Sequence, residues 1–186
     1  MRPKKKIATV SLAGCFGCHM SVLDLDLELL ALTELVQFDR SPLTDIKTFQ
    51  HRVDIGLIEG AVCNDHNLHV LRDFRKNCDI LISLGECAIM GGLPAMRNDI
   101  PLSECLTEAY LGVPTSVVGS TVLPHHPDLP KILDRVYPCH EVVKIDYFLA
   151  GCPPSAEVIA LALKSLIQGD LKNGQLQLPP ELIKYD

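Results

Sequence analysis

Five short apolar runs are the feature of this 186-residue chain that most restricts its fold. They are rich in β-branched residues, and most of them end at a glycine. The runs are KKIATVSL (5–12), VDIGLIEG (53–60), CDILISLGE (78–86), VPTSVVGS (113–120) and VVKIDYFLAG (142–151). Short apolar runs of this kind, without regular alternation, are typical of parallel strands that are covered on both faces of a sheet. The sequence therefore predicts five buried strands in a mainly parallel sheet.

Segments with a helical pattern lie between these runs. Leu68, Leu71 and Phe74 recur at helical spacing along 65–77, and 154–168 has a wide apolar face. Prolines precede the second segment and a glycine follows it, which is the usual composition of helix ends. Strands that alternate with helices build a doubly wound α/β sheet with helices on both faces.

The segment VLDLDLELLAL (22–32) has an ambiguous pattern. Apolar and acidic residues alternate in it, which favours a strand, but leucine, aspartate and glutamate are not the residue types that strands prefer. A helix would place Leu23, Leu27 and Leu30 on one face and would supply the crossover that two parallel strands need. We expect a helix here, followed by a further strand at VQFD (36–39).

The length of the chain fits one domain. We expect this domain to span residues 1–170, with 88–112 and 121–140 as glycine- and proline-punctuated connections that have room for short helices. The segment 171–186 has too little apolar periodicity to add to the core, so we expect a C-terminal arm.

Charge and composition exclude several classes of partner. The net charge is −6 and the one basic cluster is Lys4–Lys6, so a nucleic-acid partner is not expected. No apolar run is long enough to cross a bilayer, so a membrane partner is not expected either. The sequence begins without a twin arginine or an apolar signal segment, which predicts a cytoplasmic location. Eight cysteines in such a chain indicate metal binding or redox chemistry rather than disulfides.

Half of the cysteines follow predicted strands. Cys15 and Cys18 come after the first strand, Cys87 follows ILISLGE and Cys152 follows YFLAG. The carboxyl ends of parallel strands meet at one edge of a sheet, so we expect these thiols to gather there. Glycines adjoin all of them and let the backbone pass close to a bulky inorganic group. These glycines are Gly14, Gly17, Gly85 and Gly151.

Four thiolates can hold either a tetrahedral zinc ion or a cluster of four irons and four sulfides. Structural zinc is usually held by two closely spaced pairs, whereas here one pair is close and the other thiols are single residues on distant loops. This spacing favours the iron–sulfur cluster, and a zinc-stabilised interaction module stays as the alternative. The remaining cysteines are interpreted as ordinary small apolar residues. They are Cys63, Cys78, Cys105 and Cys139.

Three further side chains lie close to these thiols in the sequence or in the predicted fold. Glu59, at the end of a strand, could adjust a cluster or move a proton, or could be a solvated or helix-starting residue, and Glu86 has the same two interpretations. His19 could donate to a sulfide or act as a ligand, but a histidine that caps the following helix is the favoured interpretation.

A second group resembles a metal site in composition only. It consists of His125, His126, Cys139 and His140, and the prolines beside these residues indicate a surface loop. We therefore do not expect a second metal there.

The quoted motifs resemble those of a known family. GCFGCHMS, GLIEG, SLGECAIMGG and AGCPPS occur in this order over residues 14–156. They are similar to the motifs of the small, electron-transferring subunit of nickel–iron hydrogenases and, more distantly, of the 20 kDa cluster subunit of respiratory complex I. The resemblance implies a flavodoxin-like fold and a partner large subunit that carries the nickel–iron centre. It also implies a single 4Fe–4S cluster held by Cys15, Cys18, Cys87 and Cys152 and supported by Gly14, Glu59, Gly85 and Gly151.

Two differences within this resemblance restrict the class of small subunit that we expect. Complex I relatives have adjacent cysteines in the first motif, whereas this chain has CxxC, as hydrogenases do. The chain also lacks the leader and the second cluster domain of membrane-facing hydrogenase small subunits. It is therefore similar to the short small subunits of cytoplasmic, NAD-reducing hydrogenases, in which a diaphorase module with flavin completes the complex.

Two questions stay open at this point. Small subunits of coenzyme F420-reducing hydrogenases and of sulfhydrogenases are also short, so the resemblance does not fix the electron acceptor. A flavodoxin-like fold could hold FMN at the strand ends. The turn after the first strand is occupied by cysteines instead of a phosphate-binding loop, so FMN is not expected.

Overall fold

The core of the protein is a six-stranded sheet with the order β10-β7-β5-β3-β1-β2. The computed structural model describes residues 4–115, 117, 119, 121–169, 171–172, 175–176 and 180–184. The strands of this sheet are β1 (Lys5–Ser11), β2 (Val36–Phe38), β3 (Val53–Glu59), β5 (Cys78–Leu84), β7 (Tyr147–Leu149) and β10 (Leu182–Lys184). All neighbouring pairs are parallel except β10 with β7. The parallel strands thus follow the flavodoxin-like order, and the predicted fold class is confirmed.

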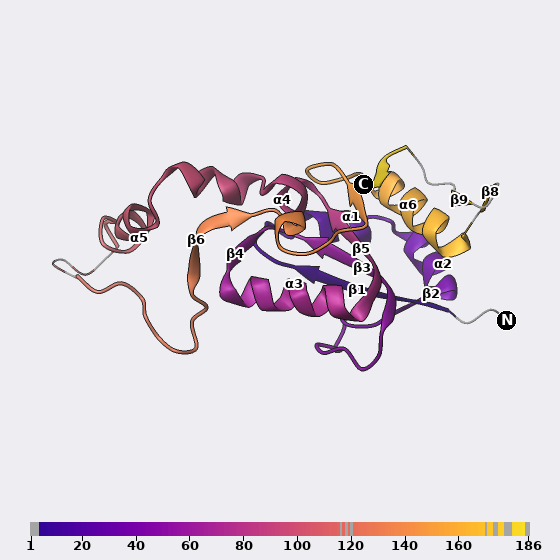
Figure 1. Ribbon diagram of the computed structural model, residues 1–186, viewed down its shortest axis with the longest axis horizontal. Coiled ribbons are helices and arrows are strands. Elements are labelled where there is room, and N and C mark those ends of the chain that lie inside the picture. The colour runs from indigo at the N-terminus through magenta and orange to yellow at the C-terminus, as the bar shows by residue number, and fades with distance from the viewer. Residues whose placement is uncertain are drawn as a thin grey trace.

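Three helices cover one face of the sheet. They are α1 (Gly17–Leu23), α2 (Leu27–Leu35) and α6 (Ala156–Gln168). Figure 1 shows α2 and α6 beside each other at one end of the sheet. Val22 of α1, Leu32 of α2 and Ile159 of α6 are all buried in one apolar cluster with the strands. This packing fixes α1, and with it the segment that carries Cys18, against the sheet.

Helix α3 (Asp65–Asn77) covers the opposite face, in front of the sheet in Figure 1. Asn64 caps this helix, because its side chain accepts a hydrogen bond from the backbone N–H of Asn67. Val70, Leu71 and Phe74 are buried in a second apolar cluster with residues of β3 and β5. The sheet is therefore covered on both faces, as its continuous apolar strands predicted.

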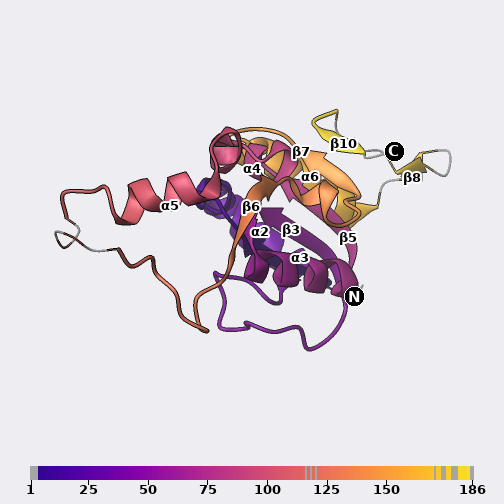
Figure 2. The same cartoon turned by 60° about the vertical axis from the view of Figure 1, so that its left-hand side comes forward.

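Smaller elements connect the strands. They are α4 (Glu86–Met90), η1 (Leu93–Asp99), α5 (Leu102–Tyr110), β4 (Val62–Asn64), β6 (Ile132–Tyr137), η2 (Cys139–Glu141), β8 (Leu171–Lys172) and β9 (Gln175–Leu176). β4 and β6 form a separate two-stranded sheet, as do β8 and β9. Helix α5 and the connection after it extend away from the main sheet in both Figure 1 and Figure 2. None of the helices in the described part of the chain is long and apolar enough to cross a membrane.

Most of the predicted elements occur, with differences at three of them. The run 113–120 was expected to be a strand, but its described residues lie in turns and irregular backbone. This prediction was wrong because the run follows the projecting α5, where no strand lies beside it to pair with, and Val117 is 81% exposed. The predicted helix over 22–32 is interrupted, since Asp26 has a positive φ of 51° between α1 and α2. The predicted strand over 142–151 is reduced to Tyr147–Leu149.

The segment expected to be a C-terminal arm is partly attached to the sheet. The backbone of β10 pairs with β7, with Leu182 opposite Leu149 and Lys184 opposite Tyr147. Strand β6 within 121–140 was also not predicted, because half of its residues are exposed and it shows no continuous apolar run. The division of the chain at residue 170 stays a prediction.

Gly56 of β3 provides a direct test of the packing between β3 and β5. A Cβ atom at this position would lie 2.6 Å from the Cys78 sulfur and 2.7 Å from Cδ1 of Leu81. We expect Gly56→Ala to lower the free energy of unfolding by about 1–3 kcal/mol through overpacking. The same substitution in a Cys78→Ala background should cost less, because the nearest atom has been removed. Denaturant unfolding of the native protein, the two single variants and the double variant measures this coupling. Additive effects would contradict the packing described here.

Candidate metal centre

The loops after the parallel strands bring the predicted site residues to one edge of the sheet. Cys15 lies exposed in the loop after β1, and Cys18 lies in the first turn of α1. Phe16, between them, has a positive φ of 68°, which turns the chain sharply from the loop into the helix. Glu59 is the last residue of β3.

Cys87 lies in the first turn of α4, Cys152 lies in the loop after β7, and hydrogen bonds join these two segments. The N–H of Gly85 donates to the Leu149 carbonyl oxygen at 2.9 Å, and the N–H of Glu86 donates to the Gly151 carbonyl oxygen at 3.0 Å. The Glu86 carboxylate in turn accepts from the N–H of Gly151 at 3.1 Å. Glu86 therefore fixes the loop that carries Cys152 against the start of α4, which carries Cys87.

The thiols share one electrostatic environment. Burial raises the pKa of Cys18 to about 12, and the negative charges of Glu59 and of the other site cysteines contribute to this rise. These other cysteines are Cys87, Cys15 and Cys152, in order of effect. The pKa of Cys87 is also raised, first by burial, and Cys152, Cys15 and Glu59 contribute. Several thiolates at this place therefore repel one another unless a positively charged group binds among them.

Glycine backbone lies directly against the sulfur atoms. A Cβ atom on Gly85, whose φ is +82°, would lie 2.4 Å from the Cys18 sulfur. A Cβ atom on Gly92 would lie 2.9 Å from the Cys87 sulfur, and one on Gly17 would lie 3.1 Å from the Cys15 sulfur. Gly85 and Gly92, which also have positive φ angles, therefore need glycine, whereas at Gly17 a Cβ atom would only make a tight contact.

The thiols are not arranged for a single ion. Within the described residues, no group of three or more His, Cys, Asp or Glu side chains is placed to hold one metal ion. The four thiols nevertheless influence one another electrostatically. Four thiolates at one edge of the sheet are a donor set that an iron–sulfur cluster can use.

Glu59 is buried below the CxxC segment. It is 2% exposed, and its two oxygens accept hydrogen bonds from the N–H groups of Cys18 at 3.3 Å and His19 at 3.2 Å. It also bonds to Nδ1 of His19. The carboxylate thus satisfies the first N–H groups of α1 from a neighbouring strand. The interpretation of Glu59 as a solvated residue is therefore wrong.

His19 links the Glu59 carboxylate to two hydroxyl groups on the side away from the thiols. It lies within α1, so the interpretation of His19 as a cap of the following helix is wrong. Its Nε2 hydrogen-bonds to the Thr9 hydroxyl at 2.9 Å, and this hydroxyl hydrogen-bonds to the Ser41 hydroxyl at 2.7 Å. The ring of Phe16 stacks on the imidazole, with centroids 4.6 Å apart. Thr9 and Ser41 were not found from the sequence, where the only signal is a hydroxyl within an otherwise apolar strand.

Gly14 has a packing role beside this site. A Cβ atom on Gly14 would lie 3.2 Å from Cα of Gly60, at the end of β3. The neighbouring Ala13 exchanges two backbone hydrogen bonds with Ala61, of 2.9 and 2.7 Å. The close approach of these two segments holds the loop of Cys15 against the end of β3.

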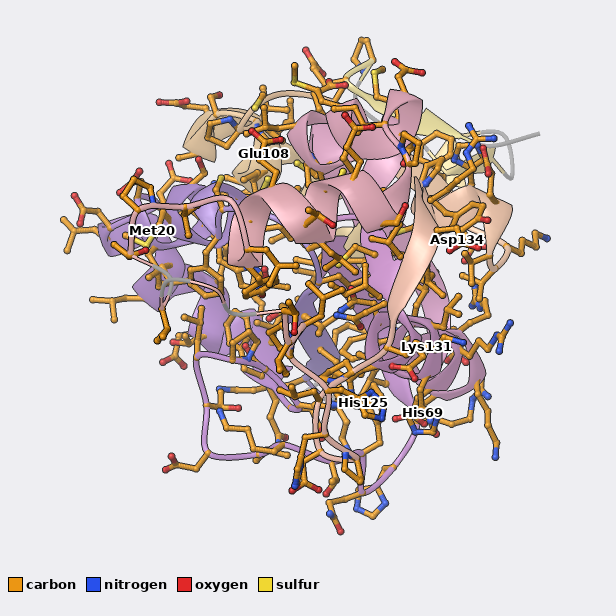
Figure 3. The ribbon with its side chains drawn as sticks, turned by 90° about the vertical axis from the view of Figure 1, so that its left-hand side faces the viewer. Met20, His69, Glu108, His125, Lys131 and Asp134 are labelled. Atoms are coloured by element: carbon orange, nitrogen blue, oxygen red, sulfur yellow. The ribbon has the colours of Figure 1, made fainter. Side chains whose placement is uncertain are left out.

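His125 and His126 of the second predicted group lie within the segment 123–132. Figure 3 shows His125 well apart from Met20, which lies on the same helix as Cys18. His125 lines an apolar groove of about 680 Å³ between α5 and the segment 123–132, and none of the four site thiols lines it. His126 instead contacts the Asp128 carboxylate at 3.3 Å. Cys139 is fully buried and donates to the Gly60 carbonyl oxygen at 3.5 Å.

Comparisons with known proteins identify the family. The sequence model of the NADH ubiquinone oxidoreductase 20 kDa subunit family matches residues 15–166, which include all four site cysteines. The chain belongs to this family. It is 50% identical, over 98% of its length and 86% of the relative's length, to the delta subunit of the NAD-reducing hydrogenase HoxS of Cupriavidus necator. The predicted relationship to the small subunits of NAD-reducing hydrogenases, a class of oxidoreductase, is therefore confirmed.

Solved structures and further relatives agree with this assignment. A chain of the NAD⁺-reducing nickel–iron hydrogenase, solved in its H2-reduced state, superposes with a TM-score of 0.89 at 49% identity. The match covers 99% of this chain and 100% of that one. A subunit of the F420-non-reducing hydrogenase of Methanothermobacter marburgensis is 36% identical over 96% of this chain, and the match spans 57% of that longer relative. The nickel–iron–selenium hydrogenase of Desulfomicrobium baculatum, at 15% identity and a TM-score of 0.59, shares the fold.

Substitution of Gly85 tests whether the site depends on this close backbone approach. Gly85→Ala places a methyl group against the Cys18 sulfur, so we expect the purified protein to lose most of its bound iron. Gly169→Ala is the matched control, because Gly169 also has a positive φ, of +62°, but a Cβ atom there meets nothing within 4 Å. Iron content and circular dichroism of both variants make the comparison. Native iron content in Gly85→Ala would contradict the arrangement.

Substitution of Cys139 tests whether this buried thiol is a residue of the apolar core rather than a metal ligand. Burial raises its pKa from 9.0 to about 12, so the folded state keeps the thiol neutral where the unfolded state ionises. The contribution of this group to stability is complete below pH 9 and is lost as the pH rises towards 12. Between pH 8 and pH 10 the loss should be about 1 kcal/mol. Unfolding measured at both pH values should show this loss in the native protein, and the loss should be smaller by that amount in Cys139→Ala. Equal pH dependence of the two proteins would contradict the assignment.

Proposed function

We propose that this chain is the electron-transferring small subunit of an NAD-reducing nickel–iron hydrogenase. In this proposal Cys15, Cys18, Cys87 and Cys152 hold a single 4Fe–4S cluster. The observation that carries the proposal is the 50% identity with the delta subunit of a NAD-reducing hydrogenase, over nearly the whole chain. The convergence of four thiols from three strand ends on one electrostatic environment supports the ligand set.

The residues of this chain hold and shield the bound group. When bound, a 4Fe–4S cluster accepts and releases single electrons. The four thiolates ligate it, and the glycines beside them leave room for the backbone to approach the sulfur atoms. Glu59 fixes the CxxC segment through two backbone N–H groups and adds negative charge nearby. Glu86 holds the loops of Cys87 and Cys152 together.

The proposal includes two partners and a location. Electrons pass between the nickel–iron centre of a large subunit and a diaphorase module with flavin and iron–sulfur clusters, which reduces NAD. A cytoplasmic location fits the eight cysteines, none of which forms a disulfide within the described residues. FMN bound to this chain is not part of the proposal.

Hydrogenases with another electron acceptor are the second candidate. The 36% identity with a subunit of an F420-non-reducing hydrogenase favours this candidate over a quinone-linked subunit of the complex I type. The CxxC spacing of Cys15 and Cys18 also differs from the adjacent cysteines of complex I relatives. Reduction of NAD by hydrogen in the purified complex distinguishes the two hydrogenase candidates.

Removal of single ligands tests the proposal. Each of Cys15→Ala, Cys18→Ala, Cys87→Ala and Cys152→Ala should abolish hydrogen-dependent NAD reduction, because the thiolate that completes the cluster is missing. Cys63→Ala and Cys105→Ala are the matched controls, since both cysteines are partly buried and were predicted to lie outside the site. Iron, nickel, zinc and acid-labile sulfide are counted in every natively purified complex, together with the visible absorption spectrum.

The outcomes separate the alternatives clearly. The native complex and both controls should contain one 4Fe–4S cluster more, in iron and acid-labile sulfide, than each ligand variant, and should absorb more strongly near ~400 nm. Equal iron and sulfide in the native complex and the ligand variants, with zinc lost from the variants, would establish the interaction module instead. Full activity in any three of the four ligand variants would show that the ligand assignment is wrong.

A further inference from the structure

A buried chain of hydrogen bonds leads from the loop after β2 to the CxxC segment. We call Ser41, Thr9, His19 and Glu59 the polar chain. Each of these side chains is at most 2% exposed, although all of them are polar or ionisable. They come from four different parts of the sequence: the loop after β2, β1, α1 and the end of β3. Hydrogen bonds of 2.7 Å and 2.9 Å join Ser41 to Thr9 and Thr9 to His19, and His19 bonds to Glu59.

The burial of these polar side chains costs free energy, and the packing of the sheet does not need polar residues at these positions. Burial of polar side chains is unfavourable unless every hydrogen-bonding group finds a partner. Valine has nearly the same shape as threonine, and it would fill position 9 of this strand without needing a partner. Since every member of the polar chain is hydrogen-bonded, we infer that the chain acts on the first turn of α1, where it ends.

The geometry shows how the polar chain orients this turn. The imidazole and the N–H of His19 both bond to Oε2 of Glu59, which leaves Oε1 for the N–H of Cys18. The Thr9 hydroxyl holds the other ring nitrogen, and the Ser41 hydroxyl holds the Thr9 hydroxyl. The stacked ring of Phe16 limits rotation of the imidazole. Together these contacts restrict rotation of the His19 ring and of the Glu59 carboxylate.

We propose that the polar chain is a positioning device that fixes the Glu59 carboxylate beneath Cys18 and so sets the geometry and the local field of the four-thiol site. The inference rests on the proposed function, because it names Thr9, His19 and Ser41 as positioning residues for the same cluster. The Glu59 charge acts on both Cys18 and Cys87, so its orientation affects two of the four thiols.

Substitution of Thr9 tests the inference without changing any residue beside a thiol. Thr9→Val removes the hydroxyl and leaves Nε2 of His19 without its partner, whereas Thr9→Ser keeps the hydroxyl. We expect Thr9→Val to change the electron paramagnetic resonance spectrum of the reduced cluster and to shift its midpoint potential. Iron release to a chelator should be faster by about 2- to 10-fold, as expected for the loss of one buried hydrogen bond. Thr9→Ser should restore native behaviour.

Val70→Ala controls for a general loss of stability. Val70 is buried between α3 and the other face of the sheet, so this variant lowers stability without contacting the polar chain. We expect the midpoint potential and the spectrum of Val70→Ala to match the native protein. Equal changes in Thr9→Val and Thr9→Ser, or in Thr9→Val and Val70→Ala, would overturn the inference. So would native behaviour of Thr9→Val.

Amide hydrogen exchange on the same purified complexes separates this inference from the proposed function. The N–H groups of Cys18 and His19 should exchange faster in Thr9→Val than in the native protein and in Thr9→Ser. Iron and sulfide contents that do not differ between the native complex and the four ligand variants would overturn the proposed function, and the exchange rates would then decide the positioning role alone. Unchanged exchange at both N–H groups would overturn the positioning role even where the cluster is present.

Discussion

The parallel pairing of β1, β3, β5 and β7 is the constraint on which the site depends. Each strand is in register with its neighbours, so the loops after these strands begin at the same edge of the sheet. The thiols and Glu59 are separated by up to 137 residues in the sequence, from 15 to 152, yet they reach this edge from adjacent strands. Apolar clusters on both faces of the sheet hold the strands in this order. The packing of the sheet therefore brings the segments that carry the thiols together at one edge.

Electrostatic repulsion is concentrated at this edge. Four thiols and one buried carboxylate lie within reach of one another, and the pKa of Cys18 rises to about 12 as a result of burial and these charges. This arrangement disfavours ionised thiols when no cationic group is bound. It favours the binding of a group that supplies positive charge. The glycines that touch the sulfur atoms and the bonded loops of Glu86 and Gly151 keep the thiols in place against this repulsion.

The sequence predicted the fold class, the central strands and α3 because these depend on local apolar pattern and capping. It also predicted which strand ends carry the cysteines. It did not predict the break at Asp26 or the irregular backbone after α5, since these depend on what packs beside each segment. Thr9 and Ser41 were missed for a related reason. A hydroxyl in a strand is not informative until the three-dimensional structure places it beside the His19 ring.

The central claim is that four thiolates from three strand ends surround one iron–sulfur core. A crystal structure of the native complex, with anomalous scattering recorded at the iron edge, measures this most directly. The account predicts one compact group of iron atoms in contact with the sulfur atoms of Cys15, Cys18, Cys87 and Cys152. Iron bound elsewhere on this chain, a single metal ion between the thiols, or one of these sulfur atoms lying outside the group of ligands would contradict the account.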